Sequence, residues 1–276
     1  MPTIAIHGVE YYYEVTDASQ GKQPDAAPLV LLHGFTGSAD AWAAQVEVFS
    51  AYRPVITIDL LGHGQTDAPV DPARYGMAQS AQDLAALLTA IAPGRVNLCG
   101  YSMGGRLALY FALTYRHLVQ RLILESASPG LADMAARQER SQSDEQLASA
   151  IETHGIAAFV ERWEALPLFA SQRGLPSAVQ NRLHEQRLHN RPHGLANSLR
   201  GMGTGVQPAL WEQLYALSVP TLLLAGALDQ KFKVIAEQMA TYLPKATVAI
   251  IPDAGHTIHL EQPKAFQTAV INFLQT

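Results

Sequence analysis

The chain has 276 residues and a formal net charge of −5, with 48% hydrophobic and 16% charged residues. This composition is typical of a globular protein and excludes a disordered or collagen-like chain, and its acidic balance gives no reason to expect binding to nucleic acid. No apolar run approaches the roughly 18 residues of a membrane span, and residues 1–4 do not begin a secretory signal. A single cysteine, Cys99, allows no internal disulfide, so we expect a cytoplasmic protein.

Two kinds of pattern follow one another along the chain. Residues 3–16 alternate around His7-Gly8, which predicts a β-hairpin, and a polar linker follows at 17–28. Short apolar runs then alternate with longer helical patterns, which is typical of a mostly parallel sheet with helices on both faces. The predicted strands are 29–32, 55–58, 96–99, 122–124, 221–224 and 248–251; the predicted helices are 39–50, capped by Ser38, and 78–91, 103–115 and 262–274.

The alternation stops between residues 129 and 217. This interval is helix-like and rich in Gln, Arg, Ala and His, and 12 of the 14 arginines lie between Arg95 and Arg200, where there is no lysine. Helices inserted between two strands would cover the carboxyl edge of the sheet, where α/β folds bind ligands. We therefore predict a core of residues 1–128 and 218–276 and a helical lid at 129–217, called the lid below. Its predicted breaks are Gly155, Pro167, Gly174, Pro176, Pro192 and Gly194.

The strongest signal for chemistry lies between the predicted strand 96–99 and the predicted helix 103–115. The residues there read Gly100-Tyr101-Ser102-Met103-Gly104-Gly105, which is the G-x-S-x-G nucleophile elbow in its strand–turn–helix context. Flanking glycines permit a sharp turn, so Ser102 would project from the sheet at a helix N-terminus. The alternative, an ordinary serine in a glycine-rich turn, is disfavoured by these flanking elements.

A serine hydroxyl needs a base, and the base needs an acid to orient it. His256, on the loop after the last predicted strand, is the candidate base, and we expect its neighbour His259 to be a helix-start or packing residue. Asp229, just past the predicted strand 221–224, is the candidate acid, with Glu125 as the runner-up and Asp253 as a weaker choice. Serine, aspartate and histidine then follow one another in the order of an α/β-hydrolase triad.

An oxyanion hole should come from two backbone amides. One belongs to Met103, directly after the serine, and the other to Phe35 in His33-Gly34-Phe35-Thr36-Gly37. We expect His33 to brace this loop. Zinc, P-loop and strand-linked dinucleotide motifs are missing from the sequence, so no metal or nucleotide cofactor is implied.

These motifs resemble the α/β-hydrolase superfamily over essentially the whole chain, and more narrowly the 2-succinyl-6-hydroxy-2,4-cyclohexadiene-1-carboxylate synthases, lyases of menaquinone biosynthesis. Arg106 directly after the elbow and the motifs of the lid are the discriminating part. The resemblance rests on His33-Gly34-Phe35-Thr36-Gly37-Ser38 with Trp42, Asp59-Leu60-Leu61-Gly62-His63-Gly64, Gly100-Tyr101-Ser102-Met103-Gly104-Gly105-Arg106, Ser128-Pro129-Gly130-Leu131, Pro167-Leu168-Phe169 and Gly201-Met202-Gly203-Thr204-Gly205.

The resemblance implies elimination of pyruvate from 2-succinyl-5-enolpyruvyl-6-hydroxy-3-cyclohexene-1-carboxylate. It implies that Arg106, Arg140 and Arg187 bind the carboxylates of this substrate, in keeping with the suitability of arginine for bidentate contacts. It also implies that Tyr101 and Trp163 line the pocket. The triad serine would then act as a base, without an acyl-enzyme.

Two other functions remain open. A carboxylesterase or carbon–carbon bond hydrolase could use the same triad through an acyl-enzyme. A non-catalytic receptor could keep the pocket on the same fold, but it would have no need for all three triad groups. The fold alone does not choose among these, because one scaffold hosts many reactions.

Overall fold

The structure is a computed structural model that describes residues 2–18 and 26–275. Its centre is an eight-stranded sheet in the order β1-β2-β4-β3-β5-β6-β7-β8. Strand β2 pairs antiparallel with both of its neighbours, and the strands from β4 to β8 pair in parallel. The predicted fold class is confirmed. The strands are β1 (Thr3–Ile6), β2 (Val9–Thr16), β3 (Leu29–Leu32), β4 (Val55–Ile58), β5 (Val96–Tyr101), β6 (Val119–Glu125), β7 (Thr221–Gly226) and β8 (Ala246–Ile251).

Strand bounds follow the apolar runs closely. The predicted strands 29–32 and 55–58 coincide with β3 and β4, in which every residue is buried. The other parallel strands are longer than predicted at one or both ends, because sheet pairing continues past the apolar run. The predicted hairpin forms around His7 and Gly8, both with positive φ. Of the predicted linker 17–28, residues 19–25 lie outside the described part of the chain.

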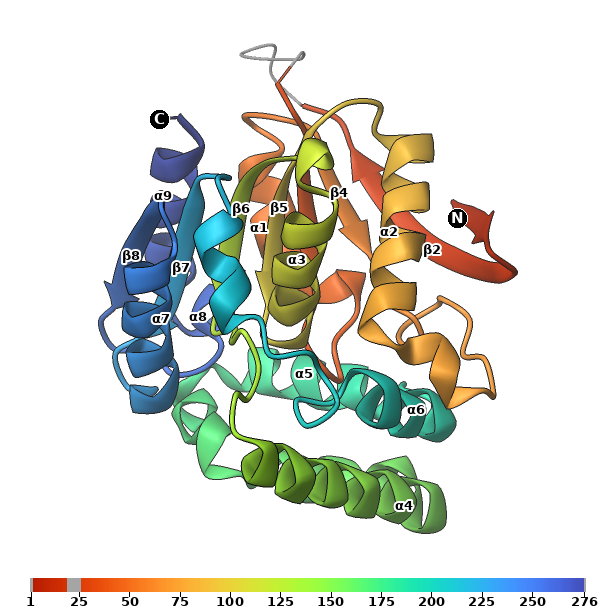
Figure 1. The fold of residues 1–276 in the computed structure, drawn as a ribbon. Coiled ribbons are helices and arrows are strands. Elements are labelled where there is room, and N and C mark those ends of the chain that lie inside the picture. Colours follow the sequence, from red (N-terminus) through yellow and green to blue (C-terminus); the bar gives the residue numbers. More distant parts are fainter. Residues whose placement is uncertain (1, 19–25, 276) are drawn as a thin grey trace.

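Helices cover both faces of the sheet (Figure 1). One face packs against α2 (Met77–Ile91), α3 (Met103–Thr114) and α7 (Gln230–Tyr242). The other packs against α1 (Ala43–Phe49) and α9 (Pro263–Gln275). Each face thus has its own apolar cluster, and each large aliphatic or aromatic side chain buried there contributes about 1.5–3 kcal/mol. The short helices outside the lid are η1 (Ala39–Trp42), η2 (Pro72–Tyr75), η3 (Arg116–Leu118) and α8 (Ile258–Glu261).

Two helix predictions need correction. The predicted helix 39–50 is the 3₁₀ helix η1 followed by α1, and the prediction that Ser38 caps it is wrong, because its side chain makes no capping hydrogen bond. The Ser38 hydroxyl instead accepts a hydrogen bond of 2.6 Å from Gln186 of the lid. The predicted helix 262–274 is α9, preceded by the separate turn α8.

A long helical region lies between β6 and β7, across the carboxyl edge of the sheet (Figure 1). Gly155 interrupts α4 with φ 80° and ψ 176°, and prolines open η4 and α6, as the breaks predict. Gly194 is no break: it lies inside α6, where a Cβ atom would come 2.3 Å from the Gly62 carbonyl oxygen. The helices of this region are α4 (Met134–Glu164), η4 (Pro167–Gly174), α5 (Ser177–Leu188), α6 (Pro192–Met202) and η5 (Trp211–Ala216).

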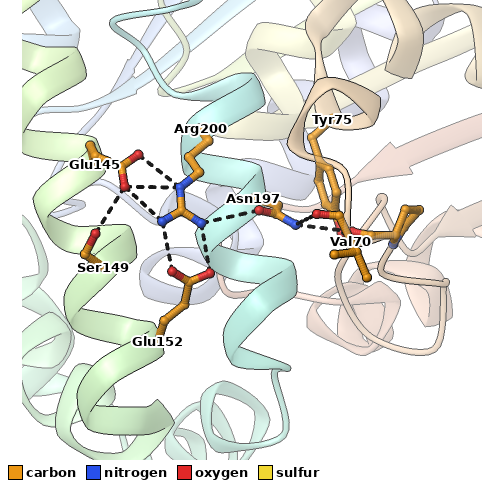
Figure 2. A network of polar contacts seen from close by, with 8 residues as sticks. Val70, Tyr75, Glu145, Ser149, Glu152, Asn197 and Arg200 are labelled. Carbon is orange, nitrogen blue, oxygen red and sulfur yellow. Dashed lines mark hydrogen bonds and ion pairs between the residues drawn. The ribbon is translucent and has the colours of Figure 1, made fainter.

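Polar contacts attach α6 to its neighbours on both sides (Figure 2). Arg200 donates to Glu145 and Glu152 of α4 at 2.8–3.2 Å. One turn earlier, Asn197 donates to the Val70 carbonyl of the core at 3.0 Å. Helix α6 therefore connects the long helix of the lid to the core.

Candidate active site

Ser102 occupies a sharp turn between β5 and α3. Its φ is 49° and its ψ is −108°, a left-handed conformation rare for a residue with a side chain. The Ser102 amide donates to the Glu125 carbonyl at 2.8 Å, which ties the turn to β6. A Cβ atom at Gly104 would come 2.4 Å from the His33 carbonyl oxygen, so this position requires glycine. The predicted strand–turn–helix context of the serine is present.

Ser102, His256 and Asp229 form one hydrogen-bonded chain. The distance from Ser102 Oγ to His256 Nε2 is 3.0 Å, and the distance from His256 Nδ1 to Asp229 Oδ2 is 2.7 Å. A carboxylate only accepts, so Nδ1 carries the proton and Nε2 is free to accept the serine proton. His256 is 2% exposed and Asp229 is 9% exposed, so little water competes for these contacts. The arrangement can move a proton from the serine hydroxyl to the imidazole.

Packing fixes the histidine ring. The ring of Phe232 lies 4.6 Å from that of His256, centroid to centroid, and the ring of Tyr101 lies 5.5 Å away. The Asp229 side chain also accepts from the Phe232 amide at 3.2 Å, which caps α7. The acid is thus held by the start of a helix and the base by aromatic contacts.

The alternative residues have other partners. Glu125 is fully buried and accepts from both the amide and Nδ1 of His259, at 2.8–3.0 Å. His259 in turn packs on Trp42 with a centroid distance of 4.3 Å. This pair lies next to the triad but belongs to the core packing, as expected for His259. Asp253 is exposed in a turn with φ 55° and makes no contact with the triad.

The predicted oxyanion donors, Phe35 and Met103, both line the cavity that contains Ser102. His33 lies beneath the Phe35 loop, where Nδ1 donates to the Gly34 carbonyl at 2.8 Å and Nε2 accepts from the Leu60 amide at 3.0 Å. Burial lowers the pKa of His33 to about 3, so the ring is neutral and braces the loop.

The cavity around Ser102, called the central cavity below, has a volume of about 400 Å³. The core supplies its floor and the lid its cover. Tyr101, Arg106, Arg140 and Trp163, which the resemblance implied as binding residues, all line it. The indole Nε1 of Trp163 is buried without a hydrogen-bond partner in the described part of the chain, so it is a donor available to a ligand.

Two arginines stand close together on the wall of this cavity. Arg106 donates from Nη1 to the Met202 carbonyl at 2.6 Å and to Gln207 Oε1 at 2.9 Å. Arg140 donates from Nε to Asp144 at 2.8 Å. Burial and the neighbouring Arg140 lower the pKa of Arg106 to about 10, so it remains a cation near pH 7. A pair of cations in a cavity of mixed polarity favours an anionic ligand.

Arg187 does not line the central cavity. It lines a smaller cavity of about 40 Å³, where it donates to Glu164 at 2.9 Å and to Gln172 at 3.0 Å. Its guanidinium also lies 5.4 Å from the centroid of the Phe169 ring, which is itself 6.2 Å from the ring of His256. The structure therefore brings two of the three predicted arginines to Ser102.

Ser126 and Lys231 are polar residues of the central cavity that the sequence analysis did not single out. Ser126 is 2% exposed, has φ 48°, and its hydroxyl has no hydrogen-bond partner in the described residues. A strained, unpaired polar group in the cavity of Ser102 is free to contact a ligand. Its position directly after β6 was an available signal. Lys231 also lines the cavity, although it carries no motif of its own.

No group of three or more His, Cys, Asp or Glu side chains in residues 2–18 and 26–275 could hold a metal ion. In the same residues, no helix has the length and apolar character needed to cross a membrane.

The sheet, elbow and inserted helices define an α/β-hydrolase fold, and residues 27–263 match the family model described as alpha/beta hydrolase fold. A Bacillus subtilis (strain 168) protein, provisionally named 2-succinyl-6-hydroxy-2,4-cyclohexadiene-1-carboxylate synthase, is 45% identical over 93% of this chain and 93% of its own length. The protein of that name from Serratia proteamaculans (strain 568) is 33% identical over 94% of this chain and 97% of its own.

A solved structure agrees with these relatives. MenH from S. aureus superposes with a TM-score of 0.91 at 39% identity, covering 95% of this chain and 97% of that one. The chain belongs to the α/β-hydrolase family and, within it, to the family of 2-succinyl-6-hydroxy-2,4-cyclohexadiene-1-carboxylate synthases.

Proposed function

We propose that the protein eliminates pyruvate from 2-succinyl-5-enolpyruvyl-6-hydroxy-3-cyclohexene-1-carboxylate in menaquinone biosynthesis. The observation that carries this proposal is the chain of hydrogen bonds from Asp229 through His256 to Ser102, which ends in a cavity lined by Arg106 and Arg140. Relatives that carry the synthase name over nearly their whole length support it. The single cysteine, Cys99, is buried, and we keep the cytoplasm as the proposed location.

The positions of the double bonds define the electron flow. The substrate is a 3-cyclohexene and the product a 2,4-cyclohexadiene, so a proton leaves the ring carbon beside the succinyl ketone. The ring double bond shifts, and the bond from ring carbon 5 to the enolpyruvyl oxygen breaks. The released enolpyruvate takes up a proton and becomes pyruvate.

The triad supplies the base for this step. Ser102 Oγ removes the ring proton while its own proton passes to His256 Nε2, and Asp229 stabilises the imidazolium. The amides of Phe35 and Met103 stabilise the negative charge that develops on the ketone oxygen. His256 then returns a proton to the departing enolpyruvate, and no bond forms between the serine and the substrate.

Binding and positioning fall to separate residues. Arg106 and Arg140 bind carboxylates, Trp163 donates its free N–H, and Tyr101 holds the wall of the cavity through its hydroxyl, 2.8 Å from Thr257 Oγ1. We assign Arg187 an indirect role, since its ion pair with Glu164 and its contact with Phe169 hold an aromatic ring beside His256.

The test follows pyruvate release from the enolpyruvyl substrate, coupled to NADH oxidation by lactate dehydrogenase, next to hydrolysis of a neutral aryl ester. We expect steady pyruvate release and no burst of aryl alcohol. A burst equal to the enzyme concentration without pyruvate would instead establish the esterase that forms an acyl-enzyme.

A further inference from the structure

Three cationic side chains line the central cavity: Arg106, Arg140 and Lys231. The two arginines are already hydrogen-bonded within the protein, to Met202 and Asp144. Lys231 has no hydrogen bond or ion pair with any residue in 2–18 and 26–275, and its Nζ lies 5.7 Å from the centroid of the Phe232 ring. Its ammonium can therefore meet a carboxylate without first leaving a protein partner.

The backbone of Lys231 is fixed relative to the triad. Lys231 lies in the first turn of α7, two residues after Asp229, whose carboxylate both caps this helix and holds His256. The next residue, Phe232, packs its ring on that of His256. Lys231 is exposed, so its flexible side chain reaches the cavity from the start of α7, whereas the two arginines belong to α3 and α4.

Helix stability does not explain this lysine. The N-terminus of a helix carries a partial positive charge, so a cation in the first turn is unfavourable. The first turn of α7 contains no acidic residue, and the carboxylate at its N-cap, Asp229, already accepts from the Phe232 amide and from His256. A side chain that weakens its own helix while lining a cavity points to a role in that cavity.

We propose that Lys231 binds a carboxylate of the substrate, one different from those bound by Arg106 and Arg140. The inference rests on the proposed function, whose substrate carries three carboxylates, on the ring, the succinyl chain and the enolpyruvyl group. The central cavity then offers one cation for each of them. Cations carried by three different helices would orient the ring so that its acidic proton faces Ser102.

The test compares two lysines of the same helix in the pyruvate-release assay. K231Q removes the cation of the cavity, and K233Q removes the same charge from a side chain that does not line the cavity. We expect K231Q to raise KM about tenfold with kcat within about twofold of the wild type, and K233Q to change both by less than about twofold. K231R should recover most of the loss, because it restores the charge.

The outcomes separate this inference from the proposed function. Wild-type protein that releases no pyruvate would overturn both. Active wild type with an unchanged KM in K231Q, or with equal increases in K231Q and K233Q, would overturn the role of Lys231 alone. We expect K231Q to keep or raise the melting temperature, so a higher KM will not reflect unfolding. If K231Q does unfold, K231R becomes the test, and a KM of K231R that differs from that of the wild type would count against the role of Lys231.

Discussion

The lid consists mainly of helices, whereas the core combines helices with the sheet, and the two regions are stabilised differently. In α3 of the core, 8 of 12 residues are buried, and they pack on the sheet. In α4 of the lid, only 5 of 31 residues are buried, and exposed ion pairs such as those of Arg200 connect it to α6. Apolar burial dominates protein stability, whereas exposed ion pairs contribute little. Stability therefore resides mainly in the core.

The central cavity joins these two regions. Ser102, Asp229 and His256 come from loops of the core, whereas Arg140 and Trp163 come from α4. The proposed reacting groups thus depend on the stable part of the molecule, and much of the proposed substrate binding depends on the weakly packed part. Variants of the core and of the lid should therefore affect the chemical step and substrate binding separately.

The largest expected effect is that of Asp229→Asn in the core. An amide cannot stabilise the imidazolium and favours the wrong tautomer of His256, so we expect pyruvate release to fall about 10⁴-fold with little change in stability. Steady-state kinetics beside a thermal melt measure both.

Glu125→Gln is the matched control, because Glu125 is also a buried carboxylate paired with a histidine. The substitution removes the buried carboxylate that accepts from the amide and the ring of His259. We therefore expect a loss of about 3 kcal/mol in unfolding free energy, with near-normal turnover in the folded protein. Folded Glu125→Gln protein without turnover, together with active Asp229→Asn protein, would show that the acid is assigned wrongly.

Residues of the site that lie at strand ends could be placed together from the sequence. The elbow, the loop after β7 and the loop after β8 must meet at one edge of a parallel sheet, so Ser102, Asp229 and His256 could be grouped from chain order alone. Arg187 could not be located in this way. Its place depends on how α5 packs on η4, and the exposed, polar helix α5 buries only Arg187 itself.

Arg106→Lys tests carboxylate binding where the core meets the lid. Arg106 lies on α3 of the core but donates to the carbonyl of Met202, the last residue of α6, and to Gln207 in the segment that follows α6. A lysine loses the planar fork, so we expect kcat/KM for the enolpyruvyl substrate to fall about 100-fold and that for a neutral ester to change less than threefold. Equal losses on both substrates would contradict carboxylate binding by Arg106.

The histidines of the core and of the lid should affect the pH dependence of stability differently. All four histidines of the lid are exposed, whereas His33 and His63 of the core are buried. Among the described residues, both ring nitrogens of His33 have hydrogen-bond partners, and His63 has one at Nδ1 only, the Leu61 carbonyl. Burial lowers the pKa of His33 to about 3 and that of His63 to about 4. In the unfolded chain these histidines take up protons below their ordinary pKa of about 6.5, whereas in the folded chain they stay neutral. Their neutral form therefore contributes fully to the unfolding free energy above that pH, and this contribution is lost as the pH falls below it.

At pH 5 each buried histidine should cost about 2 kcal/mol relative to pH 7.5. Urea unfolding at several pH values measures this loss. His63→Gln should reduce the pH dependence by about half, because His33 remains, and the exposed His154→Gln should leave it unchanged. An unfolding free energy independent of pH between 7.5 and 5 would exclude neutral, buried histidines in the core.

The fold was predictable where burial alone decides local structure. Strands such as β3 and β4 are buried throughout and read as uninterrupted apolar runs. The prediction of a helix break at Gly194 was wrong, because glycine occurs both at helix ends and where two backbones approach closely. Only the contact with Gly62, far away in the sequence, decides between the two uses.

The smallest expected effect is that of Arg200→Ala in the lid. Its two glutamate partners are 52% and 39% exposed, so we expect a loss below about 1 kcal/mol in global stability. Because these ion pairs connect α4 to α6, cleavage of the lid by dilute trypsin should nonetheless become faster. Arg162→Ala is the control: it removes an exposed arginine of α4 that has no ion pair with the described residues. A loss of 3 kcal/mol or more in the unfolding free energy of Arg200→Ala would mean that the lid and the core unfold as one unit. The two regions would then differ in how many residues they bury but not in when they unfold.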